Sequence, residues 1–185
     1  EILLSPDGRT IVFQTGMGGG YNPASTLAPP EPTLWRIDAR AGAQPVRIGA
    51  GGGPFFSPDG RRLLYRQGKD LWTLDLDGAA APKQLAAGGA GFAQPVWTAD
   101  GQALVFVQDR GGYSFLGRYQ LGADKIDWLV TGADRLISPQ LSPDGKTVAY
   151  LRFPGRQHDV TYDQTESEPF AVETVDLASG ATRTL

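Results

Sequence analysis

The chain has 185 residues, enough for one domain or two very small ones, and its content of 41% hydrophobic and 20% charged residues is typical of a soluble globular protein. A formal net charge of −3 with scattered basic residues excludes a nucleic-acid-binding surface. No apolar run reaches the roughly 20 residues of a membrane span, and the lack of cysteine excludes disulfides and thiolate nucleophiles. The chain begins at Glu1 without a signal-type segment, which we interpret as a processed or excised piece of a longer protein.

A four-residue motif recurs along the chain. Ser-Pro-Asp-Gly begins at residues 5, 57 and 142, and a weaker copy, Thr-Ala-Asp-Gly, begins at residue 98. In this motif Pro presets φ for a turn, and Gly accepts the positive φ that closes a hairpin. The copies therefore predict tight turns, each joining the first two strands of a repeated unit.

The residues around each motif repeat as well. An apolar residue precedes every copy: Leu4, Phe56, Trp97 and Leu141. An aliphatic residue stands three positions after each Gly: Ile11, Leu63, Leu104 and Val148. An aromatic residue stands five positions after it: Phe13, Tyr65, Phe106 and Tyr150. Since side chains alternate along a strand, each aliphatic–aromatic pair lies on one face of the second strand.

Two further strands are expected in each unit. The third strands are residues 34–38, 71–75, 118–121 and 172–176, and the fourth are residues 45–48, 83–85, 127–130 and 181–185. Four antiparallel strands repeated every 40–50 residues or so describe a propeller blade. We therefore predict an all-β propeller with almost no helix, whose blades lie at about 1–48, 49–85, 92–130 and 137–185 and form part of a larger propeller in the parent protein. A β-sandwich is the alternative, but it does not explain the recurring turn.

The connection between the second and third strands differs among the blades. It is much longer in the first and last blades, and it lies opposite the Ser-Pro-Asp-Gly turns, so this variable end of the blades is the expected binding end. Trp35, Trp72 and Tyr119 are interpreted as equivalent third-strand residues that pack between blades.

Two segments superficially resemble catalytic or phosphate-binding motifs. The glycines of residues 16–20 lack the spacing and the following helix of a dinucleotide fingerprint, so we interpret them as a loop. Ser114 lacks the second Gly and the following helix of a nucleophile elbow, so a nucleophilic role is not predicted.

Residues 158–168 concentrate the remaining polar chemistry. His158, Asp159, Asp163 and Glu166 are the candidate ligands for a metal, although their spacing matches no known loop and a solvated acidic loop is the simpler interpretation. Glu166 or Glu168 could instead pair with a cation such as a peptide amino terminus. We predict no bound metal or cofactor.

The repeats resemble the TolB-like propeller repeat, in which a basic residue follows the Ser-Pro-Asp-Gly turn. Arg9, Arg61 and Lys146 fit this position and Gln102 departs from it. Such repeats build TolB, a periplasmic scaffold that binds partner proteins, and the amino-terminal propellers of prolyl oligopeptidase family serine peptidases. Residues 142–155, together with Pro169-Phe170, look like a blade of the bacterial peptidases.

This resemblance implies a noncatalytic propeller that restricts and selects peptides for a carboxyl-terminal α/β-hydrolase domain. That domain would carry the Ser-Asp-His triad, so the chain alone is predicted to be inactive. Paired glutamates hold the substrate amine in dipeptidyl members, which points to Glu166 and Glu168 here. The alternative is a TolB-like protein-binding scaffold without enzymatic activity. A bacterial periplasmic location is slightly favoured, and exposed blade edges would promote self-association.

Overall fold

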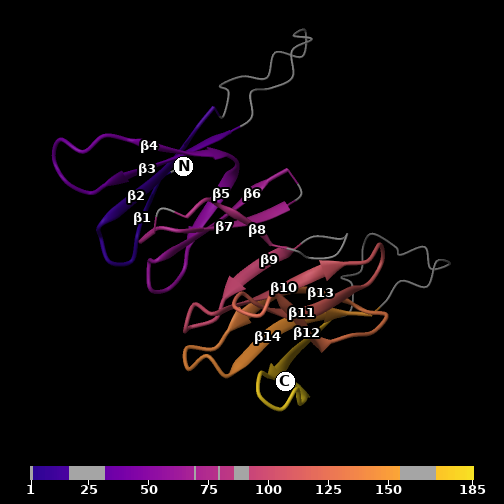
Figure 1. Cartoon of the computed structure of the whole chain (residues 1–185). Coiled ribbons are helices and arrows are strands. Elements are labelled where there is room, and N and C mark those ends of the chain that lie inside the picture. The colour runs from indigo at the N-terminus through magenta and orange to yellow at the C-terminus, as the bar shows by residue number, and fades with distance from the viewer. Residues whose placement is uncertain (1, 17–31, 69, 79, 86–91, 155–169) are drawn as a thin grey trace, which may run out of the picture. The chain divides into compact units, whose positions relative to one another are not determined.

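The computed structural model describes residues 2–16, 32–68, 70–78, 80–85, 92–154 and 170–185. Within these residues the chain forms sixteen β-strands and no helix, and the strands make four sheets of four antiparallel strands each (Figure 1). In every sheet the strands are hydrogen-bonded in chain order. The prediction of all-β blades with four antiparallel strands is therefore confirmed.

The chain divides into two compact units, residues 1–85 and 86–185, with two sheets in each. The first unit contains one sheet of β1 (Ile2–Leu4), β2 (Thr10–Thr15), β3 (Thr33–Asp38) and β4 (Val46–Ala50), and a second of β5 (Gly52–Phe56), β6 (Arg62–Gln67), β7 (Asp70–Asp75) and β8 (Lys83–Leu85). The second unit contains a third sheet of β9 (Ala93–Trp97), β10 (Ala103–Asp109), β11 (Ser114–Gln120) and β12 (Lys125–Val130), and a fourth of β13 (Arg135–Leu141), β14 (Thr147–Phe153), β15 (Ala171–Asp176) and β16 (Thr182–Thr184).

The repeated turn closes the hairpin between the first two strands of each sheet. In the second copy, the Ser57 hydroxyl donates to Asp59 Oδ1 at 2.6 Å and accepts from the backbone N–H of Arg62 at 2.9 Å. Gly60 has a φ of +72°, the left-handed conformation that favours glycine. Thr98 makes the same two hydroxyl contacts in the weaker copy, which explains why threonine substitutes for serine there.

The aliphatic–aromatic pairs of the second and fourth blades are buried in the cores of their units. In the first unit, Leu63 and Tyr65 pack with Val12 and Leu34 of the neighbouring sheet. In the second unit, a cluster from the third and fourth sheets contains Val105, Val107, Leu116, Leu136, Val148, Tyr150 and Val175. The recurring pair therefore joins each of these blades to the blade that precedes it within its unit.

The register of the third blade corrects one sequence interpretation. Phe13 pairs with Trp35 and Tyr65 with Trp72, but Phe106 pairs with Gly117, and Tyr119 lies opposite Leu104. Tyr119 is therefore not equivalent to the two tryptophans. The third strand begins at Ser114 rather than at Arg118, and a two-residue shift keeps every side chain on the same face. Alternation alone could not detect this error.

Candidate functional site

Ser114, the residue of the rejected nucleophile motif, lies at the start of β11 and is 3% exposed. Its hydroxyl donates to the carbonyl oxygen of Leu136 at 2.9 Å and accepts from the backbone N–H of Leu136 at 2.6 Å. Its own backbone N–H donates to the carbonyl of Asp134. Both contacts of the hydroxyl are with the main chain, so this side chain ties β11 to the start of β13.

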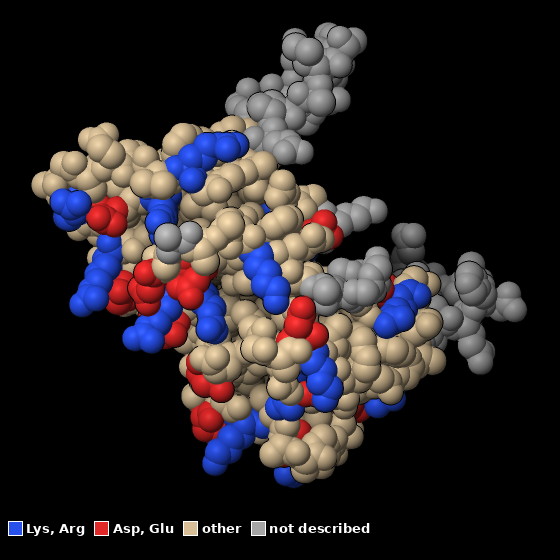
Figure 2. Space-filling view, in the orientation of Figure 1, with Lys and Arg blue, Asp and Glu red and all other residues tan. Residues whose placement is uncertain are grey.

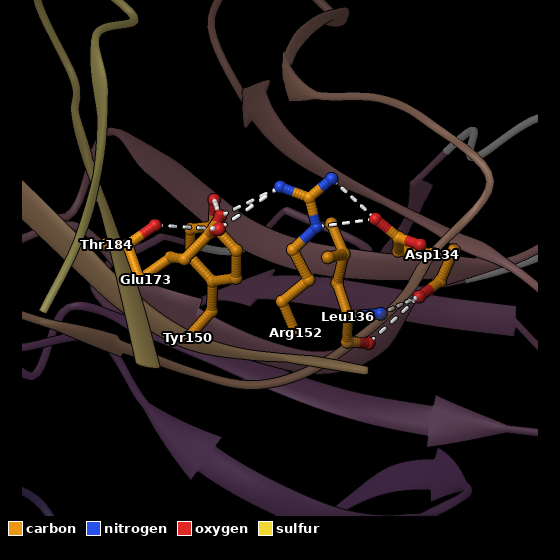
Figure 3. Close-up of polar contacts among 7 residues, drawn as sticks. Asp134, Leu136, Tyr150, Arg152, Glu173 and Thr184 are labelled. Atoms are coloured by element: carbon orange, nitrogen blue, oxygen red, sulfur yellow. Dashed lines mark hydrogen bonds and ion pairs between the residues drawn. The ribbon is translucent and has the colours of Figure 1, made fainter. Parts of the chain in front are cut away.

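A polar cluster lies beside Ser114, at the end of the fourth sheet from which β14 continues into residues 154–170. We call it the Arg152 cluster, and it consists of Asp134, Tyr150, Arg152, Glu173 and Thr184 (Figure 3). Tyr150 and Arg152 are two residues apart on β14 and therefore share a face. Glu173 lies directly opposite Tyr150 on β15, and Thr184 lies opposite Glu173 on β16.

The guanidinium of Arg152 lies between two carboxylates (Figure 3). Its Nε and Nη2 each lie 2.5 Å from Asp134 Oδ2, and its Nη1 lies 3.1 Å from Glu173 Oε1. The second oxygen of Glu173 accepts the hydroxyl of Tyr150 at 2.7 Å, and Thr184 donates to Oε1 at 3.3 Å. Glu173 is 6% exposed, and both of its oxygens have protein partners.

The electrostatics of the cluster keep Glu173 ionised. Burial raises the pKa of its carboxyl, but hydrogen bonds from Tyr150 and Arg152 and the charge of Arg152 outweigh burial, so the pKa lies below its usual value. Burial and the Glu173 carboxylate both raise the pKa of Tyr150, which keeps the phenol protonated as a donor. The hydrogen bond to Asp134 is the main cause of a raised pKa of Arg152. The cluster is thus a stable charged network.

The Arg152 cluster and a neighbouring set of aromatic contacts lie at the two ends of the connection at residues 154–170. Arg152 and Phe153 are the last two residues of β14. The guanidinium of Arg135 lies 4.8 Å from the centroid of the Phe153 ring, and that ring lies 6.0 Å from the ring of Phe170, which precedes β15. Ionic and aromatic contacts therefore hold the points where this connection leaves the sheet and returns to it.

Sequence reasoning missed this cluster as a site, although a signal for it was present. In the third strand, the position opposite the recurring aromatic is Trp35 in the first blade, Trp72 in the second and Gly117 in the third. In the fourth blade the same position is Glu173. An acidic residue at an otherwise uncharged, inward-facing position requires a buried partner. Arg152, two residues after the recurring aromatic Tyr150, could supply that partner, so the sequence could have indicated the Arg152–Glu173 pair.

A second polar region lies at the opposite end of the same unit, beside the Ser-Pro-Asp-Gly-type turns. It is a groove of about 680 Å³ whose lining includes Asp100, Gln102, Arg118, Lys146 and Asp176. Arg118 donates to the carbonyl of Leu177 at 3.2 Å and to Asp127 Oδ2 at 3.3 Å. The charges of this lining are mixed, and the main contacts of Arg118 are structural.

Arg118 has a counterpart in the first unit. Arg36 donates to the carbonyl of Leu76 at 3.2 Å, the same distance as from Arg118 to the carbonyl of Leu177. Arg36 lies opposite Val12 and Arg118 opposite Val105, so the two arginines occupy equivalent register positions. Each arginine therefore links the third strand of one blade to the next blade of its unit. This repetition favours a structural role for Arg118 over a ligand-binding one.

The predicted substrate-binding residues Glu166 and Glu168 lie outside the described residues, as do the candidate metal ligands His158, Asp159 and Asp163. In the part of the chain that the structure describes, no group of three or more His, Cys, Asp or Glu side chains could hold a metal ion. The same part contains no helix long and apolar enough to cross a membrane. On the face drawn in Figure 2, positive and negative side chains are interspersed.

The family model described as the TolB beta propeller domain matches residues 38–175, about three quarters of the chain. The chain belongs to the TolB beta-propeller domain family. The four sheets and the recurring turns are the structural counterpart of that match. The sequence matches no curated protein.

Solved structures with the same fold include TolB proteins and enzymes. TolB from Acinetobacter baumannii matches with a TM-score of 0.59 and 23% identity over 100% of this chain and 43% of its own. A candidate TolB from Agrobacterium tumefaciens has a TM-score of 0.62 and 20% identity over 98% of this chain and 62% of its own. Puromycin hydrolase has a TM-score of 0.65 and 16% identity over 99% of this chain and 28% of its own. The TolB-family chain described here thus spans less than two thirds of these TolB proteins.

Proposed function

We propose that this chain is the noncatalytic propeller segment of a prolyl oligopeptidase-type serine peptidase, where it restricts entry to the active site and selects peptides. Propellers of this fold occur in tricorn protease and puromycin hydrolase as well as in TolB. Fold alone does not determine function. The proposal therefore depends on the fourth blade, and in particular on the connection between its strands β14 and β15.

The carrying observation is the anchored base of the connection at residues 154–170. Arg152 bridges Asp134 and Glu173, and Phe153 packs against Phe170. Binding residues commonly lie on long connections whose ends are held by a rigid scaffold. The connection contains Glu166 and Glu168. We propose that these two carboxylates bind the protonated amino terminus of a peptide substrate.

The first test concerns the parent enzyme. The full natural gene product is treated with a fluorophosphonate serine-hydrolase probe, and its intact mass is measured. The expected result is a single adduct on a chain that contains this propeller and an α/β-hydrolase domain. A folded product that remains unlabelled would overturn the peptidase proposal.

The second test concerns the two glutamates. In the labelled enzyme, Glu166→Gln with Glu168→Gln should raise KM for peptides with a free amino terminus at least tenfold and leave peptides with an acetylated terminus unchanged. The expectation follows because each carboxylate attracts only the charged amine. Asp77→Asn is the matched control, because Asp77 is 71% exposed and pairs with Arg61, and both residues belong to the second blade rather than the fourth. Equal effects on free and acetylated peptides would contradict the assignment.

The family match favours a second candidate, a TolB-like scaffold that binds proteins and carries no chemistry. The two TolB structures are 20% and 23% identical to this chain, whereas puromycin hydrolase and tricorn protease are 16% and 15% identical. An unlabelled natural product that retains partner proteins in pull-downs, and loses them when residues 154–170 are replaced by a short Gly-Ser linker, would support the scaffold.

A further inference from the structure

The third blade carries a group of aromatic side chains around one arginine, beside the hairpin that joins β10 to β11. We call it the Arg110 cluster, and it consists of Arg110, Tyr113, Phe115 and Trp128. The ring centroids of Tyr113 and Phe115 lie 5.6 Å apart, and those of Phe115 and Trp128 lie 5.5 Å apart. Tyr113 and Trp128 are 39% and 40% exposed, and Phe115 is half-buried. The cluster therefore presents aromatic surface to water.

The aromatic side chains stand at register positions that are exposed and polar in the second blade. Phe115 occupies the position of Asp70 in that blade, and Trp128 occupies the position of Gln84. Asp70 and Gln84 are exposed although their blade packs against the first sheet of its unit. The position of Trp128 in the fourth blade is Thr184, which is also exposed. The packing of one blade on another within a unit therefore leaves these positions open.

Gly117 allows the indole of Trp128 to lie across the third strand of the blade. It lies directly opposite Trp128, and a Cβ added to it would lie 2.9 Å from the Phe106 ring and 3.0 Å from the Trp128 ring. The first two blades have a tryptophan at the position of Gly117. In the third blade the large ring is instead on β12, the last strand of its sheet, where it is more exposed.

The guanidinium of Arg110 is held in place by uncharged groups. Its Cζ lies 5.0 Å from the centroid of the Phe115 ring and 5.6 Å from that of the Trp128 ring. Its Nη2 donates to Oε1 of Gln108 at 2.5 Å, and Gln108 is completely buried. The adjacent carboxylate, Asp109, leaves β10 on the face opposite Gln108 and accepts a backbone N–H of the hairpin at 2.8 Å.

A guanidinium fixed in this way is suited to recognise an anion. Within the described residues, its contacts with Gln108, Phe115 and Trp128 leave its charge without a carboxylate. The planar N–H groups of arginine match the two oxygens of a carboxylate. Because the side chain is already ordered, binding costs less conformational entropy. Arginine, tyrosine and tryptophan are also the residues that contribute most to binding at interfaces.

We propose that the Arg110 cluster binds an internal acidic residue of a peptide segment, together with an aromatic residue beside it. The guanidinium binds the carboxylate, and the exposed rings of Tyr113 and Trp128 pack against the aromatic residue. An acidic side chain fits better than a chain terminus. The backbone N–H groups of Arg110, Gly111 and Ser114, which could otherwise bind a terminal carboxylate, already donate to protein oxygens. One arginine on a chain of net charge −3 favours a peptide over a nucleic acid.

Isothermal titration calorimetry of the full natural gene product tests the proposal. The ligand is the blocked peptide acetyl-Gly-Phe-Glu-Phe-Gly-amide, called the Glu peptide, which has no free amino or carboxyl terminus. The unsubstituted protein should bind it about tenfold more tightly than the same peptide with Gln in place of Glu. Arg110→Gln should weaken binding of the Glu peptide by about the same factor and remove the difference between the two peptides. Arg110→Lys should restore only part of the difference, because an ammonium group lacks the planar N–H groups and stacks less well.

Arg9→Gln is the matched control. Arg9 is 85% exposed in the first blade, and its ion pair with Asp7 is long, at 3.9 Å. This variant should bind both peptides as the unsubstituted protein does. Circular dichroism verifies that each variant is folded, and Arg110→Lys keeps the test decisive if Arg110→Gln does not fold.

Three results would overturn the proposal. They are no binding of the Glu peptide by the unsubstituted protein, equal binding of the Glu and Gln peptides, and equal effects of the Arg110 and Arg9 variants. Tighter binding of acetyl-Gly-Phe with a free carboxyl terminus, or of an oligouridylate, would also overturn it, in favour of a chain terminus or a nucleic acid. The fluorophosphonate test of the parent enzyme does not depend on any of these outcomes.

Discussion

Glu173 shows how a single residue can depart from a repeat and still be accommodated. A buried carboxylate is costly unless ionic and hydrogen-bonding partners surround it. Here Arg152, Tyr150 and Thr184 supply those partners, and each comes from a different position of the same sheet. The replacement of an uncharged side chain by Glu173 therefore depends on Arg152 at the end of β14. Without Arg152, the buried carboxylate of Glu173 would have no cationic partner among its contacts.

Glu173→Gln should lower the free energy of unfolding by about 1–3 kcal/mol. The amide would keep the shape of the side chain but turn one acceptor into a donor facing Arg152 or Tyr150. Urea unfolding measured by circular dichroism tests this expectation. Asp38→Asn is the control, since Asp38 is 67% exposed in its pair with Arg40, and it should change stability by less than about 0.5 kcal/mol. Equal effects of the two variants would mean that the cluster contributes nothing to stability.

At the scale of the element, the repeated turns determine how closely two blades approach. In the second unit, a Cβ added at Gly145 would lie 3.2 Å from the Cβ of Ala99, in the equivalent turn of the neighbouring sheet. Gly180 has the same φ, +71°, and nothing lies within 4 Å of its added Cβ. The two glycines therefore separate the backbone cost of a side chain from its packing cost.

Both Gly145→Ala and Gly180→Ala should lose roughly 1–2 kcal/mol, because a left-handed φ disfavours any side chain. Gly145→Ala should lose about 1 kcal/mol more, because its new methyl group crowds Ala99. Thermal and urea unfolding of the two variants give the comparison. Adding Ala99→Gly to Gly145→Ala should recover the extra loss. If that addition recovers nothing, crowding between the turns is not the cause.

At the scale of the whole molecule, the repeat places one carboxylate in each of the four turns. The acidic residues are Asp7, Asp59, Asp100 and Asp144. In each case the hydrogen bond from the Ser or Thr hydroxyl is the largest cause of a pKa below 3.8, followed by the bond from a backbone N–H. Asp127 adds to this set, since contacts with Lys125, Gln120 and Arg118 hold its pKa at about 2.

These depressed pKa values predict acid sensitivity. Below about pH 4 the unfolded chain binds more protons than the folded one, so the free energy of unfolding should fall as pH decreases from there toward about 2. Urea unfolding at a series of pH values tests the trend. Salt should change it little in the turns, because hydrogen bonds rather than exposed charge pairs are the main cause. Asp59→Asn should reduce the slope, and an unchanged slope would contradict the assignment.

The repeat is visible in the sequence because it is a local property. A turn at each motif and alternation along each second strand require only neighbouring residues, so blade number and strand order could be predicted from residues such as Gly60 and Tyr65. The predicted register of the third strand was wrong in the third blade, where the alternation of side chains is compatible with more than one register. In β11, a two-residue shift leaves the same faces inward, and only pairing with β10 placed Gly117 opposite Phe106.

The sequence by itself therefore determined the all-β class, the four repeated units and which side chains of each second strand share a face. Only the tertiary structure decided which charges meet. Asp134, Arg152 and Glu173 come from three separate parts of the chain, and their attraction exists only after β13, β14 and β15 have aligned. The same holds for the difference between the buried pair Leu63–Tyr65 and the partly exposed pair Ile11–Phe13. Burial depends on the neighbouring sheet, which a local pattern does not specify.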